Sequence, residues 1–291
     1  MSARIGVAAA ILSSALGGMA AAVTRFAMGT SDPVALAAFR WGIGVAILLP
    51  LALMLRARWP RGRDWAGVAG LGLLFFALFF VIFNAALGLT TAARGSLALS
   101  TLPLQTMLVG ALLRVEKLTL RKSAGVCLAV GGVAATLATG LAGAPADAWK
   151  GDLLMGSGVL CMALYSVWSR PFVARSSLLG FLTSGMGVGT AALVALAALQ
   201  GSFAPVPRYD ASQWAALAYL GVGGGALSFY LWVFALERAS PTQVAATMAV
   251  HPIAASLLAA LLVGEPIGWT LAAGVVAVLA GIAIAASPER T

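Results

Sequence analysis

Residues 86–132 read ALGLTTAARGSLALSTLPLQTMLVGALLRVEKLTLRKSAGVCLAVGG, and residues 235–281 read ALERASPTQVAATMAVHPIAASLLAALLVGEPIGWTLAAGVVAVLAG. An offset of 149 positions aligns four landmarks in the two stretches: Ala86-Leu87 with Ala235-Leu236, Pro103 with Pro252, Glu116 with Glu265, and Gly132 with Gly281. Four matches at one offset indicate an internal duplication. Each copy has room for two apolar helices joined by a short charged connection.

The rest of the chain has the same apolar character as the duplicated unit. Of its 291 residues, 61% are apolar and 9% are charged, a composition outside the range of soluble globular domains. A helix needs ~20 apolar residues to cross the ~30 Å hydrocarbon core of a bilayer. Stretches of that length predict ten membrane-spanning helices: Ile5–Met28, Pro33–Leu55, Trp65–Leu87, Ala92–Leu113, Lys122–Leu141, Gly151–Arg170, Leu178–Gln200, Trp214–Leu236, Thr242–Val263 and Gly268–Ser287.

The expected fold is an all-α integral membrane protein built from two inverted repeats. Helices are predicted because a backbone in lipid must satisfy its own hydrogen bonds, and the alternating pattern of barrel strands is missing. The first segment is interpreted as a retained helix, since no small-residue cleavage site follows a short apolar core. The duplication gives five helices to residues 1–145 and five to residues 146–291. Because five is odd, the second repeat must cross the membrane in the opposite sense, as in secondary transporters, whose binding site lies between the repeats.

The formal charge of +9 is distributed unevenly between the two ends of the predicted helices. With the N-terminus inside, 13 of the 18 Lys and Arg residues lie on the cytoplasmic side. The outer connections hold only Arg25, Arg94, Lys150 and Arg208. The positive-inside rule therefore predicts that both termini are cytoplasmic. The basic charge is a topology signal and a contact for anionic lipid, and we do not interpret it as a nucleic-acid site.

The ten apolar segments, the duplication and the motif of residues 235–281 together resemble the EamA domains of the drug/metabolite transporter superfamily. The resemblance covers nearly the whole chain. It implies two EamA-like repeats of five helices, a bacterial-type inner membrane location, and export of metabolites by alternating access. Within the superfamily, the chain is most similar to the YddG-type exporters of aromatic and other neutral amino acids. The expected partners are a small-molecule substrate and membrane lipid, with no cofactor, and the oligomeric state is left open, a monomer being compatible with the sequence.

Two prolines at matched repeat positions are candidate hinges. Pro103 and Pro252 are each predicted to interrupt a helix midway and to free the carbonyl of Leu99 or Met248. Such a carbonyl can receive a substrate ammonium group, and paired interruptions are a pointer to transporter sites. The alternative is that both prolines only bend the bundle.

A polar stripe accompanies the second proline. His251, the single histidine, follows Thr247 and Gln243 at spacings of four, so the three residues share one helical face. Facing lipid would be costly, so the stripe is predicted either to line a cavity or to form interhelical hydrogen bonds. Ser100 and Thr101 are the comparable polar residues beside Pro103.

Aromatic residues form a second candidate group, with Phe79 and Phe83 on the third helix, Tyr165 on the sixth, and Tyr230 and Trp232 on the eighth. Rings offer apolar faces to an aromatic side chain and π-faces to an ammonium group. The alternative is that the rings only pack against other helices. The predicted substrate-binding set is Arg40, Phe79, Phe83, Ser100, Thr101, Tyr165, Tyr230, Trp232, Thr247 and His251.

Arg40 lies seven residues inside the second predicted helix, about 10 Å deep at 1.5 Å per residue. Three interpretations are open: Arg40 binds a substrate carboxylate, extends to the outer surface, or pairs with Asp32 or a carbonyl group. Two glycine ridges, Gly185-x-x-x-Gly189 and Gly221-x-x-x-Gly225, are predicted to let helices approach closely and to slide during gating.

Several function classes lack their residues. The three lysines fit no phosphate-binding loop, one histidine cannot form a zinc-protease motif, and we assign no catalytic or metal-binding residue. Cys127 and Cys161 are interpreted as apolar packing residues. All nine acidic residues lie in connections or near helix ends, so a carboxylate that carries protons is missing at mid-membrane. Transport is predicted to be facilitated diffusion, or coupled to protonation of His251. The alternatives to an amino-acid exporter are an exporter of drug-like cations or other metabolites and, less favoured, a passive channel.

Overall fold

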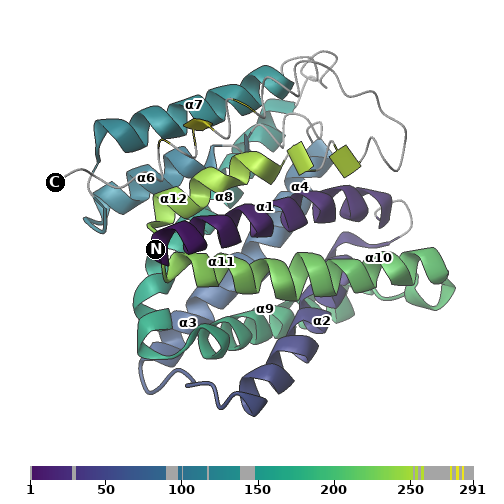
Figure 1. The fold of residues 1–291 in the computed structure, drawn as a ribbon. Helices are drawn as coiled ribbons and strands as arrows, with labels where there is room; N and C mark the ends of the chain where they lie inside the picture. Colours follow the sequence, from purple (N-terminus) through teal and green to yellow (C-terminus); the bar gives the residue numbers. More distant parts are fainter. Residues whose placement is uncertain are drawn as a thin grey trace.

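The computed structural model describes residues 2–27, 31–89, 98–99, 101–116, 118–137, 148–251, 253–254, 257–258, 276, 280–281 and 284. These residues are mainly helical, and Figure 1 shows the helices lying alongside one another in a bundle. The α-helices are α1 Ser2–Ala27, α2 Pro33–Met54, α3 Asp64–Gly72, α4 Phe80–Leu89, α6 Leu102–Leu112, α7 Leu120–Leu137, α8 Ala148–Arg175, α9 Leu178–Gln200, α10 Ala211–Gly221, α11 Ser228–Leu236 and α12 Pro241–Ala246. The π-helices are η1 Leu73–Phe79 and η4 Val222–Leu227, and the 3₁₀ helices are η3 Val206–Arg208 and η5 Thr247–Ala249.

Short polar residues start the long helices. Asp32 accepts hydrogen bonds from the backbone N–H groups of residues 34 and 35, just before the N-terminal proline of α2. Ser177 caps α9 in the same way, and Asp210 and Ser240 form capping boxes at α10 and α12. Hydrogen bonds from Ser212 and from the backbone of Gln213 lower the pKa of the Asp210 carboxyl, so this cap is charged at neutral pH.

The structure contains six described helical stretches that are long and apolar enough to span a membrane. They are 3–20, 33–54, 64–83, 149–175, 178–200 and 211–236, and each matches a span predicted from the sequence. The predicted fourth, fifth and ninth spans contain α6, α7 and α12, of which α6 is a shorter apolar helix. The chain is therefore a multi-pass helical membrane protein, and the count of ten spans stays a prediction, because most of the tenth lies outside the described residues.

A π-helix interrupts two of the long helices at matched positions. The segment η1 lies between α3 and α4, and η4 lies between α10 and α11. The first residues of the two π-helices, Leu73 and Val222, are separated by the same 149 positions as the landmarks of the duplication. The π-helix is rare and often marks a functional site. This structural match between the two halves had no counterpart in the sequence prediction.

The first helix of each half packs within the other half. Helix α1 contacts α10, η4, α11 and α12, and Figure 1 shows it beside them. In the same way, α8 contacts η1, α4 and α6, while α2 and α9 form an extensive contact. The boundary between the halves therefore runs through the centre of the bundle, where the candidate residues lie.

Both glycine ridges form close helix contacts, as the sequence predicts. In the first ridge, a Cβ atom on Gly189 would overlap the Cβ atom of Phe76 in η1. In the second ridge, a Cβ atom on Gly221 would overlap the side chain of Ile43 in α2. A hydrogen atom in place of each Cβ lets α9 approach η1, and lets the α10–η4 junction approach α2. Sliding of these ridges stays a prediction.

Candidate functional site

A cavity of about 500 Å³ opens at the Arg-rich end of the bundle, which we define as the end formed by the α2–α3, α8–α9 and α11–α12 connections. One wall comes from the C-terminal end of α2 and the loop that follows, and the others come from the α8–α9 corner and from α11. The lining residues are Leu55, Ala57, Arg58, Val173, Ala174, Ser177, Leu178, Leu179, Tyr230, Phe234, Glu237 and Arg238. The cavity therefore lies between residues of the two halves.

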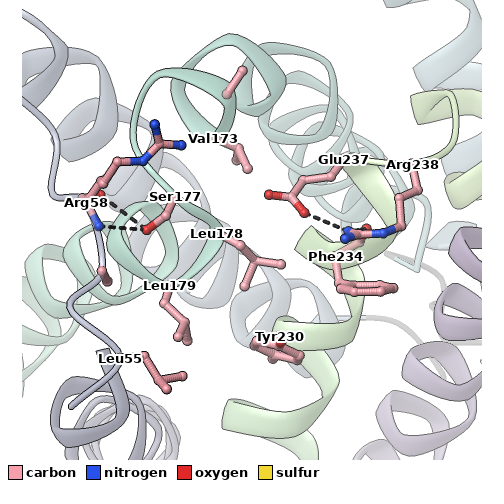
Figure 2. Close-up of a pocket in the computed structure, with 12 residues that line it drawn as sticks. Leu55, Arg58, Val173, Ser177, Leu178, Leu179, Tyr230, Phe234, Glu237 and Arg238 are labelled. Carbon is pink, nitrogen blue, oxygen red and sulfur yellow. Dashed lines mark hydrogen bonds and ion pairs between the residues drawn. The ribbon is translucent and has the colours of Figure 1, made fainter. Parts of the chain in front are cut away.

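Hydrogen bonds fix two of these walls against each other. The backbone N–H of Arg58 donates to Ser177 Oγ at 3.1 Å, and Ser177 Oγ donates to the Arg58 carbonyl at 3.2 Å, as Figure 2 shows. A Cβ atom on Gly180 would overlap that carbonyl. Arg175 also forms a bidentate pair with Asp64 at 2.8–3.1 Å. The α2–α3 connection and the α8–α9 corner are thus held together as one unit.

The α11 wall supplies two rings and both signs of charge. Tyr230 and Phe234 are stacked with centroids 6.3 Å apart. The Arg238 guanidinium lies 3.5 Å above the Phe234 ring and donates to Glu237 at 2.6 Å, an arrangement visible in Figure 2. Both charged side chains are about a third exposed, at 33% and 29%. The cavity can therefore contact an apolar group, an anionic group and a cationic group of one small molecule.

A cluster of aromatic rings lies at the boundary between the halves. Phe75 stacks on Phe79 at 5.1 Å and contacts Tyr165 at 4.8 Å and Phe229 at 5.2 Å. Phe83 joins the cluster through Phe79 at 5.7 Å. The structure thus brings together the predicted residues Phe79, Phe83 and Tyr165.

Three buried polar atoms have no hydrogen-bond partner among the described residues. The hydroxyl of Tyr165 and the indole Nε1 atoms of Trp41 and Trp232 are buried without a hydrogen bond, and the three side chains are at most 2% exposed. Buried polar groups are normally satisfied by protein or ordered water, so an ordered water molecule is the expected partner of these atoms.

Serine and threonine hydroxyls join α1 to the second half. Ser13 and Ser228 exchange hydrogen bonds at 2.7–3.2 Å. Ser14 Oγ lies 3.0 Å from Thr247 Oγ1, and Thr247 also donates to the Val244 carbonyl. Thr247 is fully buried and forms an interhelical hydrogen bond, which is one of the two alternatives predicted for the polar stripe.

His251 lies against α1 at a pair of glycines. A Cβ atom on Gly17 would lie 3.2–3.4 Å from the imidazole ring, and one on Gly18 would overlap the His251 carbonyl. The missing side chains therefore make room for His251. Gln243 at the other end of the stripe belongs to the capping box of α12.

Arg40 reaches from α2 to the second π-helix. Its Nη2 atom donates to the Gly224 carbonyl at 2.7 Å, and the guanidinium lies 4.9 Å from the Trp41 ring centre and 5.4 Å from that of Phe80. Of the three alternatives, the structure shows the carbonyl partner. Asp32 instead caps its own helix.

The residues around the first proline have local partners. Thr101 donates to the Ala98 carbonyl at 2.6 Å and accepts a hydrogen bond from Gln105, which also reaches the Gly156 carbonyl in α8. Helix α6 begins at Leu102, so Pro103 lies in its first turn, where the missing N–H costs least. Residues 98–99, earlier in the predicted span, are also helical, and the hinge role of Pro103 stays a prediction. Ser100 and Pro252 lie outside the described residues, so their predicted roles stay predictions.

The repeated glutamate has a role that the sequence prediction did not include. Glu116 accepts a hydrogen bond from the backbone N–H of Thr242 at 3.1 Å, at the start of α12, and pairs with Lys122 at 3.2 Å. Its side chain is 6% exposed. A carboxylate at a helix N-terminus compensates the unpaired N–H groups and the helix dipole. Glu116 therefore ties the α6–α7 connection to the second half.

Other residues of the site were also missed. Trp41, Arg58, Glu237 and Arg238 were absent from the predicted binding set, although they surround the aromatic cluster or line the cavity. Of the predicted set, only Tyr230 lines the cavity. The excess of arginine at one end of the helices was interpreted as a topology signal and a lipid contact, and it was the available signal for the charged part of the cavity.

The sequence was compared with models of known protein families. The model described as the EamA-like transporter family matches twice, over residues 4–138 and 149–287. The chain belongs to the EamA-like transporter family. The family predicted from the repeated motif is therefore confirmed, and this EamA-like transporter moves a solute across a membrane.

Curated relatives and a solved structure extend this result. An uncharacterized protein of Pseudomonas aeruginosa, PA1977, is 32% identical, covering 89% of this chain and 85% of that protein. The aromatic amino acid exporter YddG of Ancylobacter novellus is 29% identical over 87% and 86%. A probable terminal-alkyne amino-acid exporter of Streptantibioticus cattleyicolor is 28% identical over 72% and 69%. A chain of known crystal structure has the same fold, with a TM-score of 0.76, 24% identity, and coverage of 98% of this chain and 96% of that one.

Proposed function

We propose that this EamA-like transporter exports amino acids, aromatic and other neutral ones, from the cytoplasm of a bacterial cell. In this proposal it lies in the inner membrane with both termini cytoplasmic, so the Arg-rich end faces the cytoplasm. Two inverted five-helix repeats, residues 1–145 and 146–291, then expose a site between them to one side at a time. Two curated relatives that are named as amino-acid exporters support the substrate class.

The cavity at the Arg-rich end is the observation that carries this proposal. An exporter must load its substrate from the cytoplasm, and this cavity opens between the two halves at that end. A neutral amino acid has a carboxylate, an ammonium group and a side chain. The cavity presents Arg58 and Arg238 to the first, Glu237 to the second, and the rings of Tyr230 and Phe234 to the third.

The energy source is proposed to be the substrate gradient itself. The acidic residues of the sequence lie in connections or near helix ends, so a mid-membrane carboxylate that would load and release protons is missing. Thr247, beside the histidine, is occupied by interhelical hydrogen bonds. Facilitated diffusion of an amino acid that the cell has accumulated needs no coupled ion.

Flux through purified protein in proteoliposomes tests the proposal. Radiolabelled phenylalanine, threonine and a lipophilic drug cation are supplied with and without a pH gradient. We expect saturable amino-acid flux that unlabelled amino acids inhibit and that persists when the pH gradient is removed.

The controls are protein-free liposomes and the variant Glu237→Gln, which keeps the size of the side chain and removes its charge. We expect a several-fold rise in the half-saturation concentration for phenylalanine in this variant, since one charge-assisted contact is lost. Flux of the drug cation without amino-acid flux would contradict the proposed substrate class. Loss of amino-acid flux on removal of the pH gradient would contradict facilitated diffusion.

A further inference from the structure

Arg40 is a charged group placed where the membrane is apolar. It is the eighth residue of α2, so it lies roughly 10 Å from the helix start at 1.5 Å per residue. A guanidinium at this depth is costly unless it is paired, and intramembrane ionisable groups are by default associated with function. The contacts of Arg40 therefore need a full account.

The described protein groups satisfy only part of this guanidinium. Its Nη2 atom donates to the Gly224 carbonyl, and its buried Nε atom has no partner among these residues. The rings of Trp41 and Phe80, which contact each other at 4.9 Å, lie next to it at 4.9 and 5.4 Å. None of the ion pairs among the described residues involves Arg40. The carboxylate nearest to it in the sequence, that of Asp32, caps α2. Within the described part of the chain, the positive charge is thus held by a carbonyl and two π-faces, without an anion.

The second π-helix makes the space that Arg40 occupies. A Cβ atom on Gly224 would lie 3.2 Å from Nη2 of Arg40 and would overlap the Cβ atom of Ala20 in α1. A Cβ atom on Gly225 would lie 3.1 Å from the Arg40 carbonyl. Gly224 and Gly225 therefore let α1, α2 and η4 meet around the guanidinium, and the widened turn of η4 offers a carbonyl to it.

Arg40 lies at the edge of the aromatic cluster. Trp41, the next residue, makes edge-to-face contacts with Phe76, Phe80 and Phe229 at 4.9–5.0 Å, so the guanidinium borders the aromatic cluster. The side chain of Arg40 is partly accessible, although its Nε atom is buried. An anion that reaches this point meets the unpaired Nε–H of a charged group, next to the Trp41 and Phe80 rings.

We propose that Arg40 is the mid-membrane receptor for the carboxylate of the transported substrate. The inference rests on the proposed function and makes it narrower. Substrates must carry a carboxylate, and an amine of the same shape passes this point without the interaction. The carboxylate takes a charge-assisted hydrogen bond from Nε and from the guanidinium nitrogens, while the Gly224 carbonyl keeps the guanidinium in place between passages. The competing explanation is that Arg40 only fastens α2 to η4.

The test is a cycle in which the guanidinium and the carboxylate are removed separately and together. Flux of phenylalanine and of phenethylamine, which lacks the carboxylate, is measured in proteoliposomes for wild type, Arg40→Lys and Arg40→Met. We expect Arg40→Met to reduce the transport efficiency for phenylalanine by about tenfold or more, the effect of losing a charged hydrogen bond in a dry site. The transport efficiency of Arg40→Met for phenethylamine should change by less than about twofold, because this substrate has no carboxylate for Arg40 to bind.

Arg40→Lys keeps the charge and should restore part of the phenylalanine flux, and it remains informative if the methionine variant does not fold. The matched control is Arg61→Met, an exposed arginine outside the cavity, which should leave both fluxes unchanged. Equal losses for the two substrates in folded Arg40 variants would overturn the assignment and indicate the fastening role. A wild-type protein that carries neither substrate would overturn the proposed function, a result that is distinct from equal losses.

Discussion

At the scale of single residues, glycine decides how closely the two halves approach. Gly72, at the end of α3, is buried, and a Cβ atom on it would overlap the backbone of Gly185 in α9. Gly70, two residues earlier in the same helix, has open space around it. The two glycines therefore form a matched pair: they lie in the same helix, and only Gly72 has the α9 backbone next to it.

Alanine substitutions at these positions should have opposite effects on stability. Gly72→Ala should lower the free energy of unfolding by about 1–3 kcal/mol, because backbone atoms cannot move aside as a flexible side chain can. Gly70→Ala should be neutral or stabilising by up to about 1 kcal/mol, since alanine is the better helix former. Thermal unfolding midpoints of both variants in detergent measure the difference. Equal midpoints would show that α3 and α9 do not meet as described.

At single residues, prediction from the sequence succeeded where the type and spacing of the residues were sufficient. Burial of a charge at depth singled out Arg40, and spacing identified the glycine ridges. Spacing could not decide the partner of Thr247, because Ser14 lies 233 residues away in the sequence. The place of Glu237 and Arg238 in the cavity could not be predicted either, because the opposite wall comes from the α8–α9 corner, which is distant in the sequence.

At the scale of elements, caps and π-helices follow different rules. The starts of α2, α9, α10 and α12 carry Asp or Ser caps that local sequence encodes. The π-helices have no such signal, because one extra residue in a turn changes the register of carbonyl groups and leaves the apolar composition unchanged. The predicted span 65–87 was therefore placed correctly, while the interruption inside it was not foreseen.

The cap that Glu116 provides to α12 should be measurable as stability. Glu116→Ala removes the acceptor for the Thr242 N–H and the partner of Lys122, and we expect a loss of about 1–2 kcal/mol in the free energy of unfolding. Glu116→Gln keeps an acceptor and should lose less. The matched control is Arg175→Gln, whose pair with Asp64 is 52% and 26% exposed and should contribute less than the cap because water screens exposed ion pairs. Thermal unfolding that ranks the arginine variant as the most damaged would contradict the cap.

At the scale of the whole molecule, the exchange of first helices couples the two halves. Because α1 packs within the second half and α8 within the first, neither half can move without carrying a helix of the other. Duplication and alternation of apolar segments were sufficient to predict the family and most of the spans. The exchange itself could not be predicted, since it depends on contacts between segments that are far apart in the sequence.

The central claim is that the cavity at the Arg-rich end is the loading side of an exporter that alternates between two states. The most direct test is a distance distribution by electron–electron resonance between spin labels on Arg56→Cys and Leu231→Cys, with Cys127 and Cys161 replaced, in protein shown to transport. These positions lie on the α2 and α11 sides of the cavity. Saturating phenylalanine should shift the distribution toward shorter distances, as the cavity closes over its substrate. A distribution that phenylalanine leaves unchanged would contradict the account.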